Sequence, residues 1–220
     1  IGADGSVRIG KAWADGPPQR QLQCRSAVRA VAISPDAHSL AVADGAEIRI
    51  WAVGQTPPAQ QPERTLSGHR GAVLSLSFSR DGRWLVSSSQ DRSTRVWAWQ
   101  QAGPALLTLG GHHGAVWCAR FSRDARQIVT AGDDKKVIVW DLGQATKPES
   151  RVFRGHRSPV YAADFSPDGR TVVSGDYDGN LLVWEPGRVL QDIQAIQSRL
   201  DETAREAGAA DPAIQRSLSG

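Results

Sequence analysis

Three sets of side chains have the types and spacing that hydroxyl-based catalysis would require. Each set contains a histidine, a serine or threonine eighteen residues later, and an aspartate twenty-two residues after the histidine. In such catalysis a carboxylate orients the imidazole, which removes the proton from an attacking hydroxyl. The sets are His69, Ser87 and Asp91; His112, Thr130 and Asp134; and His156, Ser174 and Asp178.

The repetition of these sets favours a structural role. A domain needs one active site, whereas a relay of buried hydrogen bonds is useful in every copy of a repeated unit. A tryptophan follows each histidine at twenty-eight residues, namely Trp97, Trp140 and Trp184, and its indole N–H adds a donor. We therefore interpret the sets as structural tetrads and expect no catalytic residue and no cofactor. The chain also lacks a Gly-x-Ser-x-Gly motif, a Walker loop and a dinucleotide fingerprint.

The elements around the tetrads form a repeat of 43 to 44 residues, the length of one four-stranded propeller blade. In each unit a first strand ends at Phe78, Phe121 or Phe165, and a turn led by Ser and Asp follows. Second strands are predicted at 84–87, 127–130 and 171–174, and third strands at 94–97, 137–140 and 181–184.

Two incomplete units precede these three. One runs from Val28 to Trp51, with Cys24, Val42 and Gly45 in the first three tetrad places, so we expect that unit to be less rigid. At the start of the chain, residues 4–9 match only a turn and a third strand.

With three Gly-His pairs and matched tryptophans, the chain resembles the WD40-repeat family over roughly residues 1–187. The pairs are Gly68-His69, Gly111-His112 and Gly155-His156. Only Trp140-Asp141 carries the family's full closing dipeptide. The resemblance implies an all-β propeller and assigns the tetrads to the hydrogen-bonded set found in one blade. About four blades and a stray turn-and-strand fall short of the usual seven, which would need about 300 residues. We therefore expect a partial propeller, the C-terminal portion of a larger protein, with upstream blades of the same polypeptide as its neighbours.

Partners in this family commonly bind the face that bears the Gly-His loops. The resemblance places two positions of each repeat there, and for each of these residues ordinary packing is an equal alternative. The residues are Leu74, Gln90, Trp117, Asp133, Tyr161 and Tyr177.

The function expected from this resemblance is a non-catalytic scaffold that binds a protein or peptide. One alternative is a sensor or regulatory tail of a larger bacterial effector, such as a WD40-fused protein kinase or protease. Another is a periplasmic propeller of the TolB type, which the Gly-His pairs disfavour. An excess of arginine over lysine, with frequent alanine and glycine, suggests a bacterial genome.

The composition argues against several other classes of function. The net charge is +3 and the arginines are intermixed with aspartate, so no basic groove for nucleic acid is expected. Cys24 and Cys118 have no paired spacing and His113 has no partner at ligand spacing, so we expect free thiols and no metal. No run of 18 apolar residues is present to span a membrane, and we expect a cytoplasmic location.

Two kinds of segment lie outside the repeats. Residues 11–23 and 52–66 are proline-rich and are expected to be surface connections at the outer edges of blades, with a proline-rich ligand site as the alternative. In the tail, 188–220, the spacing of Val189, Ile193, Ile196 and Leu200 predicts an amphipathic helix over 188–207. This helix would lie on the propeller or dock on a partner, and the fourth strand of the last blade would come from upstream sequence.

Overall fold

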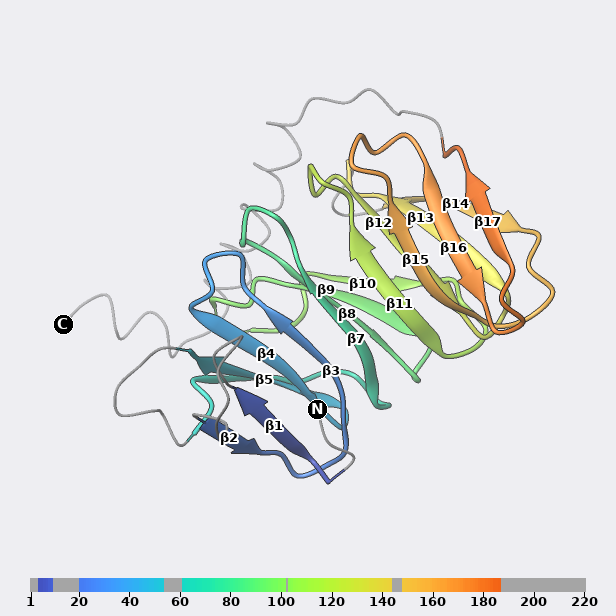
Figure 1. Cartoon of the computed structure of the whole chain (residues 1–220). Helices are drawn as coiled ribbons and strands as arrows, with labels where there is room; N and C mark the ends of the chain where they lie inside the picture. The colour runs from blue at the N-terminus through green and yellow to red at the C-terminus, as the bar shows by residue number, and fades with distance from the viewer. Residues whose placement is uncertain (1–3, 10–19, 54–60, 102, 144–147, 187–220) are drawn as a thin grey trace, which may run out of the picture.

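The computed structural model describes residues 4–9, 20–53, 61–101, 103–143 and 148–186. Within these ranges the chain forms seventeen β-strands and no helix, which confirms the all-β class. The strands make five antiparallel sheets that follow one another in chain order around an arc (Figure 1). The predicted tail helix over 188–207 and the boundary at 187 lie outside the described residues.

The first two sheets come from the incomplete units. The first pairs β1 (Ser6–Ile9) with β2 (Arg20–Gln23). The second has the order β3 (Val28–Ile33), β4 (Ser39–Asp44), β5 (Glu47–Ala52) and β6 (Arg64–Leu66).

The three complete repeats each form one of the remaining sheets. The third sheet contains β7 (Val73–Phe78), β8 (Leu85–Ser89), β9 (Ser93–Trp97) and β10 (Leu107–Gly110). The fourth contains β11 (Val116–Phe121), β12 (Gln127–Gly132), β13 (Lys136–Asp141) and β14 (Glu149–Arg154). The fifth contains β15 (Val160–Phe165), β16 (Val172–Asp176) and β17 (Leu181–Trp184).

The hydrophobic cores lie between consecutive sheets. Because side chains alternate along a strand, neighbouring residues enter different cores. In β8, Leu85 packs in the core shared with the preceding sheet, whereas Val86 packs in the core shared with the following sheet. Both are fully buried. The third sheet thus buries both of its faces, as stacking of repeats requires.

The fifth sheet has a covered face and an open one. Val172 is fully buried in the core shared with the fourth sheet, whereas the adjacent Val173 is 42% exposed. Leu181 and Val183 on β17 are also exposed. Among the described residues no fourth strand pairs with β17, so the predicted source of that strand stays a prediction.

The first strands of successive sheets, β3, β7, β11 and β15, are called the inner strands here. They pack side by side along the concave side of the arc (Figure 1). Outer strands β2 and β6 are formed by the ends of the proline-rich segments, where we expected connections at the blade edge.

Candidate binding surface at the bulged ends of the inner strands

The first two tetrads form closed hydrogen-bond chains. Nδ1 of His69 lies 2.8 Å from Asp91 Oδ2, and its Nε2 lies 2.8 Å from the hydroxyl oxygen of Ser87. The indole N–H of Trp97 donates to that same hydroxyl oxygen at 2.8 Å. The second tetrad repeats these contacts with His112, Asp134, Thr130 and Trp140 at 2.8–2.9 Å.

The chemistry of the groups fixes the direction of each hydrogen bond. A carboxylate only accepts, so Nδ1 of the histidine carries a proton, and in a neutral ring Nε2 then accepts from the hydroxyl. Burial lowers the pKa of both His69 and His112, which favours this neutral form. For Asp91, burial alone would raise the pKa, but hydrogen bonds from Ser93, the Arg70 amide and His69 outweigh it and lower the pKa to about 2.

The third tetrad differs from the prediction at its carboxylate. Nδ1 of His156 lies 2.8 Å from Oδ2 of Asp176, while Ser174 and Trp184 complete the chain as expected. The assignment of Asp178 was therefore wrong, and its carboxylate accepts a hydrogen bond from Ser158 instead. Asp176 stands at the end of β16, directly opposite Val160, and reaches the imidazole from the strand rather than from the turn.

The hydroxyl groups of these tetrads are not accessible to a substrate, so they cannot act as the nucleophiles that their residue types would permit. The hydroxyl of Ser87 or Thr130 already contacts a histidine and an indole, and the side chains of both residues are fully buried. A nucleophile must reach its substrate. In this geometry the sets connect the third strand, the second strand and the Gly-His loop of each sheet.

The second sheet has a different connection at the same place. Asp44 accepts hydrogen bonds from the backbone N–H groups of Arg25 and Ser26 at 3.0 and 2.7 Å, and pairs with Nε of Arg49 at 3.0 Å. Like Asp176, it ends a second strand opposite the first valine of the sheet, here Val28. An aspartate at this register in two units is the signal that sequence reasoning missed.

Each inner strand has a β-bulge near its first residue. In β7, Val73 pairs with Ser89 and Ser75 with Ser88, so Leu74 is skipped in the ladder. Trp117 in β11 and Tyr161 in β15 are skipped in the same way. In β3 the register shift lies between Val28 and Val31 and includes Arg29. A bulge re-aims the side chain of the extra residue, and bulges often occur beside functional sites.

The turns between second and third strands are held against these bulges. The backbone N–H groups of Gln90, Asp133 and Tyr177 each donate, at 2.9 Å, to the carbonyl one residue before the first strand. The bulge residues and the turn residues therefore lie at the same end of the inner strands, where each inner strand begins. We call this surface the mouth. The mouth consists of Arg29, Leu74, Gln90, Trp117, Asp133, Tyr161 and Tyr177.

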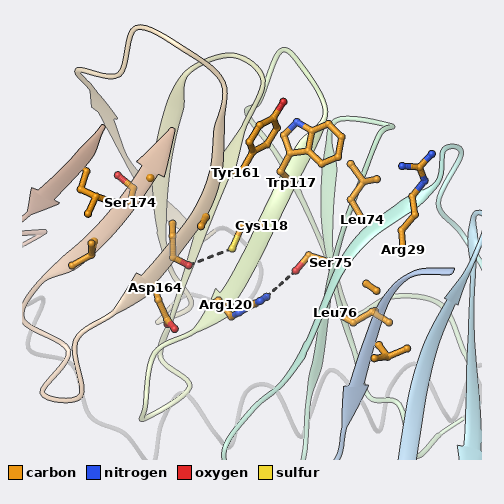
Figure 2. A pocket seen from close by; sticks show the side chains of 17 residues that line it. Arg29, Leu74, Ser75, Leu76, Trp117, Cys118, Arg120, Tyr161, Asp164 and Ser174 are labelled. Atoms are coloured by element: carbon orange, nitrogen blue, oxygen red, sulfur yellow. Dashed lines mark hydrogen bonds between the residues drawn. The ribbon is translucent and has the colours of Figure 1, made fainter. Parts of the chain in front are cut away.

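The mouth opens on a groove of about 560 Å³ along the inner strands. Figure 2 shows Tyr161, Trp117, Leu74 and Arg29 in a row along its rim. Deeper in the groove, Arg120 of β11 donates a hydrogen bond to the Ser75 hydroxyl of β7 at 2.8 Å. Such a bond holds adjacent inner strands together and fixes the spacing of the rim residues above.

The predicted partner-binding residues differ in how accessible they are. Leu74 is buried, Trp117 is half-buried, and Gln90 and Asp133 are exposed. Tyr161 and Tyr177 are 43% and 71% exposed, which is high for side chains of their size. Sequence reasoning did not single out Arg29, which is exposed at the bulge of β3.

The described residues contain neither a candidate metal site nor a membrane-spanning helix. No group of three or more His, Cys, Asp or Glu side chains in these ranges could hold a metal ion. No helix long and apolar enough to cross a membrane is found in the described part of the chain. Cys24 and Cys118 are free and buried, and burial raises the pKa of each thiol.

Comparison with known proteins supports the repeat architecture. The family model described as "WD domain, G-beta repeat" matches residues 60–98, 103–141 and 147–185. The chain is 36% identical over 97 residues to the target of rapamycin complex subunit LST8 of Saccharomyces cerevisiae, covering 44% of this chain and 31% of that protein. It is 34% identical to the target of rapamycin complex subunit wat1 of Schizosaccharomyces pombe, covering 44% and 30%.

A further relative comes from a plant. The chromatin assembly factor 1 subunit FAS2 homolog of Oryza sativa subsp. japonica is 41% identical over 75 residues, covering 33% of this chain and 15% of that protein. The chain spans less than a third of the length of each of these relatives.

Proposed function

Because the chain belongs to the WD40-repeat family, we propose that it is a non-catalytic platform that binds a partner protein through the mouth. Protein partners agree with the names of the relatives, which describe subunits of the target of rapamycin complex and of chromatin assembly factor 1. These relatives give no support to the alternative of a sensor segment in a bacterial kinase or protease.

The observation that carries the proposal is the contrast between the scaffold and the bulges. The strand order and buried tetrads repeat from sheet to sheet, whereas the bulge presents a different residue each time. Arg29, Leu74, Trp117 and Tyr161 differ in charge, size and polarity, so together they form a surface with its own chemical pattern. An exposed tyrosine beside a half-buried tryptophan is also typical of binding hot spots.

A comparison of co-purified proteins tests this function. Tagged protein is isolated from its source cells as wild type, as a Trp117→Ala, Tyr161→Ala double variant, and as an Arg80→Ala, Arg123→Ala control. The control residues lie in the turns after β7 and β11, at the other end of the inner strands. We expect the mouth variant alone to lose specific partners, with melting temperatures of all three proteins measured alongside. Partners that persist in the mouth variant would contradict the proposal.

A further inference from the structure

Charge and aromatic character are unevenly distributed around the mouth. The second sheet contributes Arg29, and the third contributes buried Leu74 with uncharged Gln90. The fourth and fifth sheets contribute every aromatic ring of the mouth and its carboxylate, Asp133, and Asp178 is exposed directly after Tyr177. We call that part the acidic aromatic sector, and it consists of Trp117, Asp133, Tyr161, Tyr177 and Asp178.

The three rings of the sector form a continuous series of edge-to-face contacts. The centroids of Trp117 and Tyr161 are 5.1 Å apart with an interplanar angle of 88°, and those of Tyr161 and Tyr177 are 6.0 Å apart at 81°. Edge-to-face packing sets each ring roughly perpendicular to the next. Tyr161 and Tyr177 are 43% and 71% exposed, so part of each ring is accessible to a ligand, and the negative quadrupole of an aromatic face attracts a cation.

The two carboxylates of the sector are additional to those that the fold requires. In the fourth sheet Asp134 contacts the tetrad histidine, and its neighbour Asp133 accepts the indole N–H of Trp117 at 2.5 Å. In the fifth sheet Asp176 takes the tetrad place, which leaves Asp178 beside Tyr177 on the exposed turn. Neither Asp133 nor Asp178 forms an ion pair within the described ranges.

We propose that the acidic aromatic sector binds the cationic side chain of a lysine or arginine on a partner segment. This inference rests on the proposed function and names the chemistry of its partner. Aromatic faces and carboxylates both attract a cation, and at the rings Asp133 and Asp178 repel an anionic side chain, while Lys135 and Arg157 are exposed in the adjoining loops. Arg29, at the far end of the rim, repels a cation and so directs it toward the fourth and fifth sheets.

Small model compounds test the assignment directly. Acetyl-arginine methylamide and its citrulline analogue have nearly the same shape, and only the first is charged. Each is titrated into the ¹⁵N-labelled full chain while the indole N–H signal of Trp117 is followed, after assignment by its loss in Trp117→Phe. We expect the arginine compound to shift this signal and to bind at least about tenfold more tightly than the citrulline compound.

Two charge variants complete the test. In Asp133→Asn, Asp178→Asn the arginine compound should bind several-fold more weakly, and added salt should have less effect on its affinity. The matched control Glu149→Gln, Glu185→Gln removes the same charge from exposed positions outside the mouth and should bind like the wild type.

Equal affinity for the two compounds, no shift of the Trp117 signal, or unchanged affinity in the aspartate variant would each overturn the cation assignment. These results are separable from a failure of the platform function. If the arginine compound fails but co-purified partners still depend on Trp117 and Tyr161, only the assigned chemistry is wrong.

Discussion

Nδ1 of His156 lies 2.8 Å from Oδ2 of Asp176, and both side chains are completely excluded from solvent. Asp176 also accepts hydrogen bonds from the backbone N–H groups of Asp178 and Asn180 at 3.1 and 2.9 Å. One carboxylate thus holds the Gly-His loop, the end of β16 and the turn into β17. Removing it leaves several buried polar groups without a partner.

We therefore expect Asp176→Ala to be much more destabilising than Asp178→Ala. A lost buried partner costs about 1–3 kcal/mol, which corresponds to several degrees in melting temperature for a chain of this size. Asp178 is exposed, so its removal should change the melting temperature by less than about one degree. Equal effects of the two substitutions, measured by circular dichroism, would contradict the placement of Asp176 in the tetrad.

Acidification should reduce stability in two ranges of pH. The pKa of His69 and of His112 is lowered from 6.5 by burial, so below pH 6.5 the unfolded chain binds protons that the folded chain does not. Stability is therefore present above pH 6.5 and is lost as the pH falls below it. The pKa of Asp91 is lowered from 3.8 to about 2, so its contribution is lost as the pH falls from 3.8 toward 2.

Urea midpoints measured between pH 8 and pH 3 test this dependence. The urea midpoint of the wild type should fall as the pH drops below 6.5. The midpoint of His112→Asn should be lower at pH 8 but should fall less over the same range. If the urea midpoint instead increased as the pH was lowered from 7 to 5, the tetrad histidines would be charged in the folded chain.

Two tryptophans of the same sheet should respond very differently to truncation. Trp140 is 6% exposed in the core between the third and fourth sheets, so Trp140→Ala should cost about 3–5 kcal/mol. Trp117 lies on a bulge at the surface, so Trp117→Ala should cost about 1 kcal/mol through its contacts with Tyr161. Denaturant unfolding of both variants measures the difference. A comparable loss in both would mean that Trp117 is a core residue.

Gly132, at the end of β12, packs closely against a neighbouring backbone, and Gly110, at the end of β10, provides a matched control. A Cβ atom on Gly132 would lie 2.6 Å from the carbonyl oxygen of Ala115, whereas one on Gly110 would meet nothing within 4 Å. Gly132→Ala should therefore destabilise the fold by more than about 1 kcal/mol and disturb the Asp133 turn. Gly110→Ala should be neutral or slightly stabilising. Thermal melts and the Trp117 indole signal report the two effects, and a neutral Gly132→Ala would refute the close approach.

The regular part of the fold could be predicted from the sequence because the same residue types recur at the same positions of each repeat. Phe78, Phe121 and Phe165 end their strands as expected, and Trp97, Trp140 and Trp184 lie on third strands. The outer strands were harder to place. β10 lies beyond the last tryptophan of its unit, and its pairing depends on the edge that β9 offers.

Two features of the site could not be read from the pattern. Carboxylates stand at both Asp176, the last residue of β16, and Asp178, in the turn that follows, and spacing alone favoured the wrong one. The start of β11, Val116-Trp117-Cys118-Ala119, has no alternation of apolar and polar residues that an extra residue could interrupt, so only the pairing of both strands reveals that Trp117 is skipped. Both features depend on geometry across a sheet rather than along the chain.

The skipped positions have a consequence for how such a protein changes over generations. A residue outside the ladder can be exchanged without altering the strand register, and at Trp117 or Tyr161 the exchange leaves the cores between sheets intact. If the mouth binds a partner as proposed, a single codon change there alters the partner preference at little cost in folding. Gene duplication of a whole repeat then adds another such position, so new specificity can evolve on an inherited frame.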